Sequence, residues 1–174
     1  MQIITLKVGP LECNCYILKI NSCALVIDPG SEFEKIDRYL QDVKLKAILI
    51  THHHFDHIGA LQDLIDKYHV KVYDYHNLSN KEYTISPFIF DVIYNPGHTN
   101  DSISFYFKKE NIMFVGDFIF ADSIGRTDLE TGNMKDMQKS LNKIKKINNN
   151  ITLYPGHGPT TNLDYEKKHN IYFR

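Results

Sequence analysis

The sequence predicts an α/β fold in which layers of β-sheet are covered by helices. Short apolar runs of strand length alternate along the chain with segments whose apolar residues recur at helical spacing. The chain has 174 residues, of which 43% are hydrophobic and 24% are charged, as in ordinary globular domains. No linker rich in proline or serine interrupts this series. We therefore expect a single domain that spans residues 1–174.

The first part of the chain begins with three runs that have the character of strands. We expect strands at residues 2–8, 14–20 and 24–28. Pro29 and Gly30 then predict a turn. Ser31 and Glu34 have the spacing of a capping box, and apolar residues follow at helical spacing. These signals predict a helix over residues 32–43.

The rest of the chain continues the alternation of strands and helices. A short buried strand is expected at 47–50, and residues 51–57 join it to a helix whose apolar face comprises Ile58, Leu61, Leu64, Ile65 and Tyr68. A second helix is expected near residues 133–147, and a polar segment follows the last strand. The further strands, which look antiparallel, are expected near 70–75, 88–94, 102–107, 112–116 and 151–154.

Charge and hydropathy exclude several classes of partner. The 20 basic and 21 acidic residues are scattered and give a formal charge of -1, so we do not expect a nucleic acid as partner. The apolar runs are far shorter than the roughly 18 residues of a membrane span, so we do not expect a membrane either. The N-terminal residues lack the features of a signal peptide, so a cytoplasmic location is expected.

Three cysteines, Cys13, Cys15 and Cys23, lie near the N-terminus. Cys13 and Cys15 would share one face of a strand, but the chain has no Cys-x-x-Cys pair. We expect all three to be reduced, small residues of the core. They would act as metal ligands only with partners elsewhere in the chain.

Residues 51–57, Thr-His-His-His-Phe-Asp-His, place four potential metal donors directly after a predicted buried strand. His52 and His54 point the same way in an extended segment, whereas Asp56 and His57 enter the turn and can point elsewhere. Two neighbouring metal ions could therefore share these donors. Imidazole and carboxylate suit zinc, iron, manganese or nickel, and the lack of thiolates argues against a closed structural zinc site. The alternative is a polar, solvated loop.

Three later segments repeat one pattern, in which a strand-like run is followed by glycine and a donor. The donors are His98, Asp117 and His157. Each segment alone is compatible with an ordinary turn. Loops at strand ends are where rigid scaffolds present functional groups, and glycine allows close approach of the backbone. We therefore interpret these donors as part of the same site.

The order of these donors closely resembles the metallo-β-lactamase superfamily, in which the motif His-x-His-x-Asp-His is followed by His, Asp and His. The resemblance covers essentially the whole chain. Residues 123–129, Ser-Ile-Gly-Arg-Thr-Asp-Leu, and the segment Asn14-Cys15-Tyr16 are similar to the short, single-domain glyoxalase II-like hydrolases. The resemblance implies a four-layer αβ/βα sandwich of the metallo-β-lactamase type, with two sheets face to face and helices outside.

The resemblance also implies two divalent metal ions, with zinc as the expected ion and iron or manganese as alternatives. It assigns three ligands to each ion and one to both: His52, His54 and His98 to the first, Asp56, His57 and His157 to the second, and Asp117 to both. His53 is then an outward bystander. The remaining histidines, expected at the surface or at helix ends, are His69, His76 and His169.

Two further residues each allow two interpretations. Asp28 precedes Pro29 and Gly30 and suits a turn, but the resemblance places it beneath the metal site as a partner of a ligand. Arg126 could bind a carboxylate of the substrate, or it could hold the metal loop through Asp128.

The implied reaction is hydrolysis by a metal-bound hydroxide, because a cation lowers the pKa of water from about 15.7 to about 7. Asp56 would orient that hydroxide while acting as a ligand. A thioester such as S-lactoylglutathione suits this site, since a thiolate leaves without prior protonation. The expected partner is therefore a small-molecule thioester, and the expected activity is that of a hydroxyacylglutathione hydrolase.

Other activities remain open at the level of sequence. The leading alternative resembles the persulfide dioxygenases, which share the Gly-Arg-Thr-Asp segment and use a single iron. Hydrolysis of another ester, a lactone or a phosphodiester is also compatible with the motif. Hydrolysis of β-lactams is less favoured, because common subclasses of those enzymes have cysteine in the place of Asp117 and are exported. A metal-binding scaffold without turnover is the non-enzymatic alternative.

Overall fold

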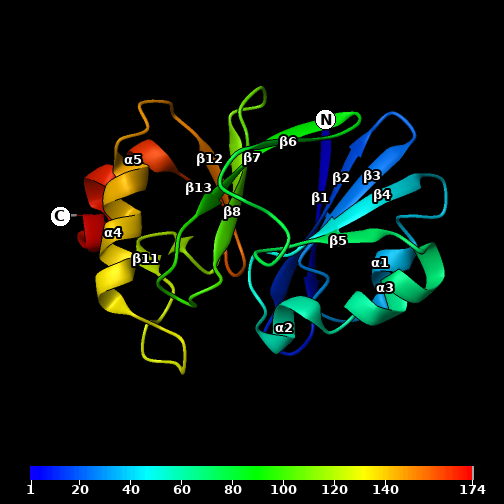
Figure 1. The fold of residues 1–174 in the computed structure, drawn as a ribbon, viewed down its shortest axis with the longest axis horizontal. Helices are drawn as coiled ribbons and strands as arrows, with labels where there is room; N and C mark the ends of the chain where they lie inside the picture. Colours follow the sequence, from blue (N-terminus) through cyan, green and yellow to red (C-terminus); the bar gives the residue numbers. More distant parts are fainter. Residues whose placement is uncertain (174) are drawn as a thin grey trace.

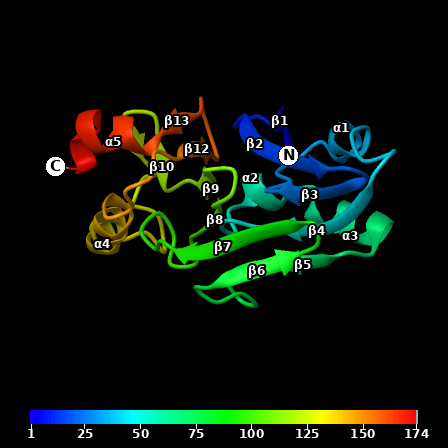
Figure 2. The ribbon, with the colours of Figure 1, turned by 90° about the horizontal axis from the view of Figure 1, so that it is seen from above.

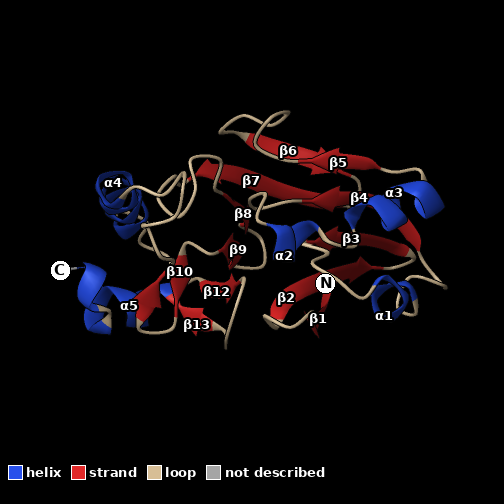
Figure 3. Cartoon of the chain, turned by 90° about the horizontal axis from the view of Figure 1, so that it is seen from below, coloured by secondary structure: helices blue, strands red, loops and turns tan. Residues whose placement is uncertain are grey.

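The computed structural model describes residues 1–173 and contains two β-sheets packed face to face, with helices on both outer faces (Figure 1). The strand order is β1-β2-β3-β4-β5 in the first sheet and β13-β12-β9-β8-β7-β6 in the second, and β10 and β11 form a separate ribbon. Figure 3 shows the strands in the middle, with α4 and α5 on one side and α1 and α3 on the other. This arrangement is the predicted αβ/βα sandwich.

The first sheet is formed by the N-terminal part of the chain. β1, β2 and β3 are antiparallel, whereas β3, β4 and β5 are parallel. Its strands are β1 (Gln2–Val8), β2 (Cys13–Ile20), β3 (Cys23–Ile27), β4 (Lys44–Leu49) and β5 (Lys71–Tyr73). The helices of this part are α1 (Phe33–Asp37), α2 (Phe55–Ile58) and α3 (Leu61–Tyr68).

The second sheet is formed by the C-terminal part. Its strands are antiparallel except for the parallel pair β9 and β12. They are β6 (Glu82–Ile85), β7 (Phe88–Tyr94), β8 (Ile103–Phe107), β9 (Ile112–Gly116), β12 (Thr152–Pro155) and β13 (Thr161–Asn162). The ribbon consists of β10 (Ile119–Phe120) and β11 (Ser123–Ile124). The helices are α4 (Met134–Lys145), α5 (Leu163–His169) and the 3₁₀ helix η1 (Ile171–Phe173).

The core has three apolar layers, which follow from the period of two along each strand. In β2, Tyr16 and Leu18 belong to the layer between the two sheets, whereas Cys15 and Ile17 pack towards α1 and α3. In β8, Phe105 faces the first sheet and Tyr106 faces α4. Figure 2 shows both sheets between the two groups of helices. Each sheet is thus buried on both faces, which explains its nearly continuous apolar strands.

The helix predicted over residues 32–43 is shorter than expected, and the predicted capping box is wrong. Glu32 precedes α1 in the left-handed conformation with φ of 55°, and no side chain caps the helix. Its carboxylate instead accepts a hydrogen bond from the backbone N–H of Gly9 at 2.9 Å. After Asp37 the chain continues in turns, although Ile36 and Leu40 are buried as the apolar pattern predicts.

The helix predicted after residue 57 is divided into α2 and α3. A Cβ atom on Gly59 would lie 2.3 Å from the carbonyl oxygen of Gly30, so the backbones of these two segments are in direct contact. The N–H of Ala60 donates to the carbonyl of Pro29 at 2.9 Å. This contact fixes the chain at the break between the two helices, close to the candidate site.

The other predictions about secondary structure have mixed outcomes. The strands predicted at 88–94 and 112–116 are confirmed with the same bounds. The parallel strands of both sheets correct the expectation of antiparallel runs. The polar C-terminal segment contains α5, and β6 was not predicted. Within residues 1–173, every helix is too short or too polar to cross a lipid bilayer.

Candidate metal centre

The candidate site lies at one edge of the sandwich, in loops that follow the ends of four strands. The 51–57 loop follows β4, His98 follows β7, Asp117 follows β9 and His157 follows β12. The short helix α2 marks this edge at the bottom of Figure 1. Because the strands are held by the sheets, the loops present their side chains at fixed positions. The structure brings together all seven predicted ligands, namely His52, His54, Asp56, His57, His98, Asp117 and His157.

Three imidazoles form one part of the site, which we call the three-histidine half: His52, His54 and His98. The Nδ1 atom of His54 lies 3.1 Å from Nε2 of His52 and 2.9 Å from Nε2 of His98. Tetrahedral ligands with metal–nitrogen bonds of about 2.0–2.1 Å have their nitrogens about 3.3 Å apart. The three ring nitrogens are therefore spaced as the ligands of one ion would be.

A carboxylate and two imidazoles form the other part, which we call the mixed half: Asp56, His57 and His157. Oδ2 of Asp56 lies 3.1 Å from Nε2 of His157 and 3.7 Å from Nε2 of His57. His57 is completely buried, whereas the side chain of His157 is 27% exposed. His157 is therefore the more exposed of the two imidazoles in the mixed half.

Asp117 lies between the two halves. Its Oδ1 atom is 3.4 Å from Nε2 of His57, and its Oδ2 atom is 3.5 Å from Nε2 of His98 and 3.6 Å from Nε2 of His157. One carboxylate thus faces ligands of both halves. This is the position that a group bridging two ions would take.

Two atoms of the site give a direct test of whether a metal fits. Among the described residues, Nε2 of His57 and Oδ1 of Asp117 are buried and have no hydrogen-bond partner. A buried nitrogen and oxygen without partners are costly, and such groups in native proteins usually have a specific reason. The two atoms lie 3.4 Å apart, one on a ligand of the mixed half and one on the shared carboxylate. The donor set therefore fits a pair of divalent ions.

The outer ring nitrogens of two ligands are fixed by backbone carbonyls. Nδ1 of His98 donates to the carbonyl of Arg126 at 2.7 Å, and Nδ1 of His157 donates to the carbonyl of Leu11 at 3.0 Å. A ring that donates from Nδ1 keeps the lone pair of Nε2 free for a metal. The two bonds therefore set the tautomer that metal binding requires.

Asp28 lies beneath the site and contacts the outer ring nitrogen of a third ligand, His57. Its Oδ2 atom lies 3.0 Å from Nδ1 of His57 and accepts a hydrogen bond from Oγ1 of Thr51 at 2.6 Å. Its Oδ1 atom accepts from the backbone N–H of Thr51 at 2.8 Å. Asp28 has φ of 50°, so it also forms the turn before Pro29. Both interpretations of this residue hold at once.

The loop that carries His157 is attached to the first sheet. The side chains of Asn14 and Tyr16 donate to the carbonyl of Pro155 at 3.0 Å and 2.5 Å. The backbone N–H of Asn14 donates to the carbonyl of Gly156 at 2.7 Å. A Cβ atom on Gly156 would lie 2.2 Å from Oδ1 of Asp117, so this position requires glycine.

Burial dominates the electrostatics of the three-histidine half. Burial, with the neighbouring His57 and His98, holds the pKa of His52 well below its usual value. Burial and the neighbouring His98 also lower the pKa of His54. Both rings are therefore neutral at physiological pH and available as ligands without the loss of a proton.

Carboxylates dominate the electrostatics of the mixed half. Burial acts against a charge on His57, yet Asp117 and Asp28 hold its pKa well above the usual value. The contact with Asp56 raises the pKa of His157 in the same way. Burial favours a neutral Asp117, but the surrounding imidazoles keep its pKa below the usual value. A cation that enters this half has to displace protons.

Arg126 does not point its guanidinium into the cluster of ligands. Its Nε and one terminal nitrogen donate to the two carboxylate oxygens of Asp128 at 2.8 Å and 2.9 Å, and both side chains are well exposed. Its backbone carbonyl is the group that contacts His98. The structure thus contains the predicted pair with Asp128, while the binding of a substrate carboxylate stays a prediction.

His53 points away from the seven ligands, as expected of a bystander, but it contacts two carboxylates. Its Nδ1 atom lies 2.5 Å from Oδ2 of Asp101, and its Nε2 atom lies 3.2 Å from Oδ2 of Asp74. The exposed His76 stands next to it, with 5.2 Å between the ring centroids. His69 and His169 are exposed at the ends of α3 and α5, as predicted.

Cys13 is a neighbour of the site that the sequence did not predict. All three cysteines are free, and Cys13 and Cys15 are buried, as expected. However, Sγ of Cys13 lies 3.6 Å from Nδ1 of His57. Burial raises the pKa of the Cys13 thiol to about 11, so it is protonated at neutral pH. The alternation of Cys13, Asn14 and Cys15 was the only signal, and it did not indicate which face meets the site.

Comparison with known proteins gives the family. A model of the Metallo-beta-lactamase superfamily matches residues 8–82 and 80–157 of the chain, which include all seven donors. The chain belongs to the metallo-beta-lactamase superfamily. Its fold and its donor set are accordingly those of a metal-dependent hydrolase of this superfamily.

Two curated relatives match over nearly their whole length. The "Probable metallo-hydrolase YqgX" of Bacillus subtilis is 32% identical, over 95% of this chain and 94% of that protein. The "Hydroxyacylglutathione hydrolase GloC" of Haemophilus influenzae is 27% identical, over 98% of this chain and 97% of that protein.

Three solved structures superpose closely on the chain. The BLEG-1 B3 metallo-beta-lactamase has a TM-score of 0.93 and 32% identity, with 99% of each chain covered. TTHA1623, solved in a di-iron-bound form, has a TM-score of 0.88 and 29% identity, with 97% of this chain and 99% of that chain covered. ETHE1 from Myxococcus xanthus has a TM-score of 0.87 and 29% identity, with 98% and 84% covered.

Proposed function

We propose that this protein is a two-metal hydrolase of the glyoxalase II type that cleaves a thioester such as S-lactoylglutathione. The observation that carries the proposal is the pair of donor groups that share Asp117. The full-length similarity to a hydroxyacylglutathione hydrolase supports the choice of substrate. The similarity to metallo-hydrolases in general supports hydrolysis.

We assign the first ion to the three-histidine half, the second to the mixed half, and Asp117 to both. Zinc is the proposed metal, because imidazole and carboxylate ligands in tetrahedral spacing suit it. Iron is the alternative with most support, since a similar protein is described in a di-iron-bound form. Manganese is compatible with the same donors.

When bound, two such cations lower the pKa of a water molecule and polarise the carbonyl group of a substrate. The side chains of the protein have to position the attacking water. The imidazoles of His157 and His57 keep the pKa of Asp56 below its usual value, although burial acts in the other direction. Asp56 is therefore ionised at neutral pH, accepts a hydrogen bond from the attacking water and orients it.

The leaving group determines what else the site needs. A thiolate leaves without prior protonation, so hydrolysis of a thioester requires no separate general acid. The leaving groups of amides and esters are stronger bases than a thiolate, so their departure requires a proton donor. In the metal-free state His157 carries a raised pKa, but as a ligand it cannot also donate a proton. This is the chemical reason to prefer a thioester.

The test is metal-loaded protein with S-lactoylglutathione, with the release of the thiol followed by a chromogenic reagent. His54→Ala is the inactive control, because it removes the ring that contacts both other imidazoles of its half. We expect thiol release by the wild type that exceeds the control by more than about 100-fold. Equal rates in the two proteins would refute the proposal.

A second candidate function is the hydrolysis of β-lactams. One observation favours it, namely 32% identity and a TM-score of 0.93 to a protein described as a B3 metallo-beta-lactamase. The same protein sample, assayed with a chromogenic β-lactam, decides between the two substrates. The persulfide dioxygenase alternative is decided with glutathione persulfide, where oxygen uptake and one iron per chain would favour it.

A further inference from the structure

A second cluster of donors lies at the same edge of the sandwich, outside the seven residues of the centre. We call it the accessory cluster: His53, Asp74, His76 and Asp101. His53 lies between two carboxylates, 2.5 Å from Asp101 and 3.2 Å from Asp74. One donor atom each of His53, His76 and Asp101 can be chosen so that all three lie within 4.8 Å of one another. This spacing suits the ligands of a single metal ion.

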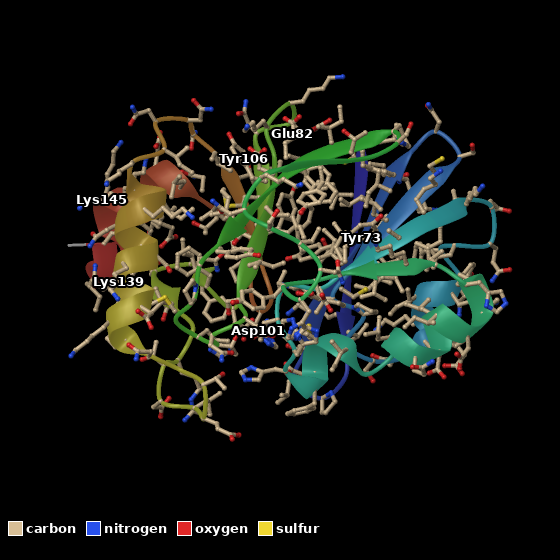
Figure 4. The ribbon with its side chains drawn as sticks, viewed as in Figure 1. Tyr73, Glu82, Asp101, Tyr106, Lys139 and Lys145 are labelled. Carbon is tan, nitrogen blue, oxygen red and sulfur yellow. The ribbon has the colours of Figure 1, made fainter. Side chains whose placement is uncertain are left out.

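The topology of the fold brings these residues together. β4 and β5 are parallel, so their carboxyl ends lie side by side. His53 follows β4, and Asp74 directly follows β5, whose last residue is Tyr73. Asp101 belongs to the loop between β7 and β8 that also carries His98. Figure 4 labels Asp101 in the lower half of the molecule, to the left of α2, with Tyr73 above it and to its right.

His53 faces away from the principal centre although its two neighbours are ligands there. In an extended segment, adjacent side chains point in opposite directions, and His54 has the extended backbone angles φ −66° and ψ 146°. His52 and His54 therefore point to the centre and His53 points to the accessory cluster. The same loop can hold donors for two separate sites.

The carboxylate of Asp74 is held in place by its own turn. Its Oδ1 atom accepts hydrogen bonds from the backbone N–H of His76 at 3.0 Å and from Nδ2 of Asn77 at 2.8 Å. Its Oδ2 atom is the one that faces His53. The carboxylates of Asp74 and Asp101 are each only 14% exposed. The cluster is therefore an ordered arrangement of partly buried charges.

The cluster opens into a hollow of about 310 Å³ beside the principal centre. The hollow is lined by His53, His54, His76, Asp101 and Glu130, among others. Two carboxylates, those of Asp74 and Asp101, meet the imidazole of His53 here. Imidazole and carboxylate donors together favour divalent ions such as zinc, cobalt or manganese. A cation from solvent can reach the cluster through this hollow.

We propose that His53, His76 and Asp101, with Asp74 behind His53, form an accessory site for a divalent transition-metal ion. Its ligands are two imidazoles and one carboxylate, which leaves a position open towards the hollow. The site is separate from the principal centre, so the proposal does not depend on the activity proposed above.

The test counts bound ions. Wild-type protein whose principal centre is already loaded with Co²⁺ is titrated with further Co²⁺, and bound metal is measured by equilibrium dialysis and elemental analysis. His76→Ala removes an exposed ligand, and Asp101→Asn weakens a second ligand while preserving the shape of the side chain. His169→Ala is the matched control, because it removes an exposed histidine at the end of α5.

We expect wild type and His169→Ala to bind one Co²⁺ per chain more than His76→Ala and Asp101→Asn. The absorption spectrum of cobalt in the principal centre should be the same in all four proteins, which shows that each variant is folded. Equal Co²⁺ content in wild type and His76→Ala would overturn the proposal. Loss of the additional ion in His169→Ala would also overturn it, since binding would then involve surface histidines in general.

Discussion

The two halves of the centre each have three donors of their own, but they differ in charge and in the residues that contact these donors. The three-histidine half is neutral, and burial lowers the pKa of His52 and His54. The mixed half contains a carboxylate, and nearby carboxylates raise the pKa of His57 and His157. Burial lowers the pKa of a histidine, whereas pairing with a carboxylate raises it. The two halves should therefore hold their ions with different dependence on protons and on neighbouring residues.

The largest effect is expected from removing the carboxylate that the two halves share. Asp117→Ala takes away the carboxylate that faces His57, His98 and His157. We expect turnover to fall by more than about 100-fold, beyond the usual effect of residues that only support ligands, and both ions to bind less tightly. Activity and elemental analysis measure the two effects.

Asp42→Ala, which removes an exposed carboxylate elsewhere, is the control for Asp117→Ala. Loss of only one ion would show that Asp117 belongs to one half. Full retention of both ions with normal turnover would contradict its position between them.

The halves can be separated by changing the support of one of them. In Asp28→Asn, the amide group replaces the carboxylate that His57 and Thr51 contact, and asparagine tolerates the φ of 50° at this position. We expect the affinity of the mixed half to fall by about 10–100-fold, with little change in the three-histidine half. Stepwise titration with Co²⁺ measures both affinities.

The control for Asp28→Asn is Asp37→Asn, which removes a carboxylate bound to Lys67 and Tyr68 far from the centre. An equal loss of metal affinity in both halves would mean that Asp28 supports the whole edge of the sheet and not His57 alone.

Protons provide a reversible way to separate the halves. The pKa of His57 is raised, so below that pKa the apparent affinity of the mixed half falls about tenfold per pH unit for each displaced proton. The pKa of His52 is lowered, so the three-histidine half keeps its ion to lower pH. On acidification the mixed half should release its ion first. Dialysis at a series of pH values, followed by elemental analysis, tests this order, and simultaneous release of both ions would contradict it.

The smallest effect is expected from Arg126→Ala. The guanidinium forms an exposed ion pair with Asp128, and the contact with His98 comes from the backbone carbonyl, which the substitution keeps. Exposed ion pairs contribute little, so we expect metal affinity to change by less than about threefold. Asp128→Ala should behave in the same way. A rise in KM of tenfold or more in Arg126→Ala alone would instead indicate that Arg126 binds the substrate.

The sequence was informative where a local pattern determines the outcome. The donors of residues 51–57 and the strands at 88–94 and 112–116 follow from short-range periodicity and spacing. The sandwich and the convergence of His98, Asp117 and His157 were accessible because these residues resemble a known family. Periodicity alone predicted the apolar faces, but it did not predict how the strands pair.

The failures depend on contacts between distant segments. The capping box predicted after Ser31 does not form, and Glu32 instead binds the backbone of Gly9, a contact that no local rule contains. The contacts of Cys13 and His53 were not predicted for the same reason, since their partners lie 44 and 48 residues away. Neighbours in space that are far apart in sequence leave no periodic signal along the chain.

The attachment of the His157 loop to β2 has a consequence for the order in which the centre is completed. Asn14 and Pro155 are 141 residues apart, so their contact requires almost the whole chain. During synthesis on the ribosome, His52 and His54 emerge about 100 residues before His157. Closure of so long a stretch is slow compared with local folding. The donors of the mixed half are therefore brought together only after nearly the whole chain has been synthesised.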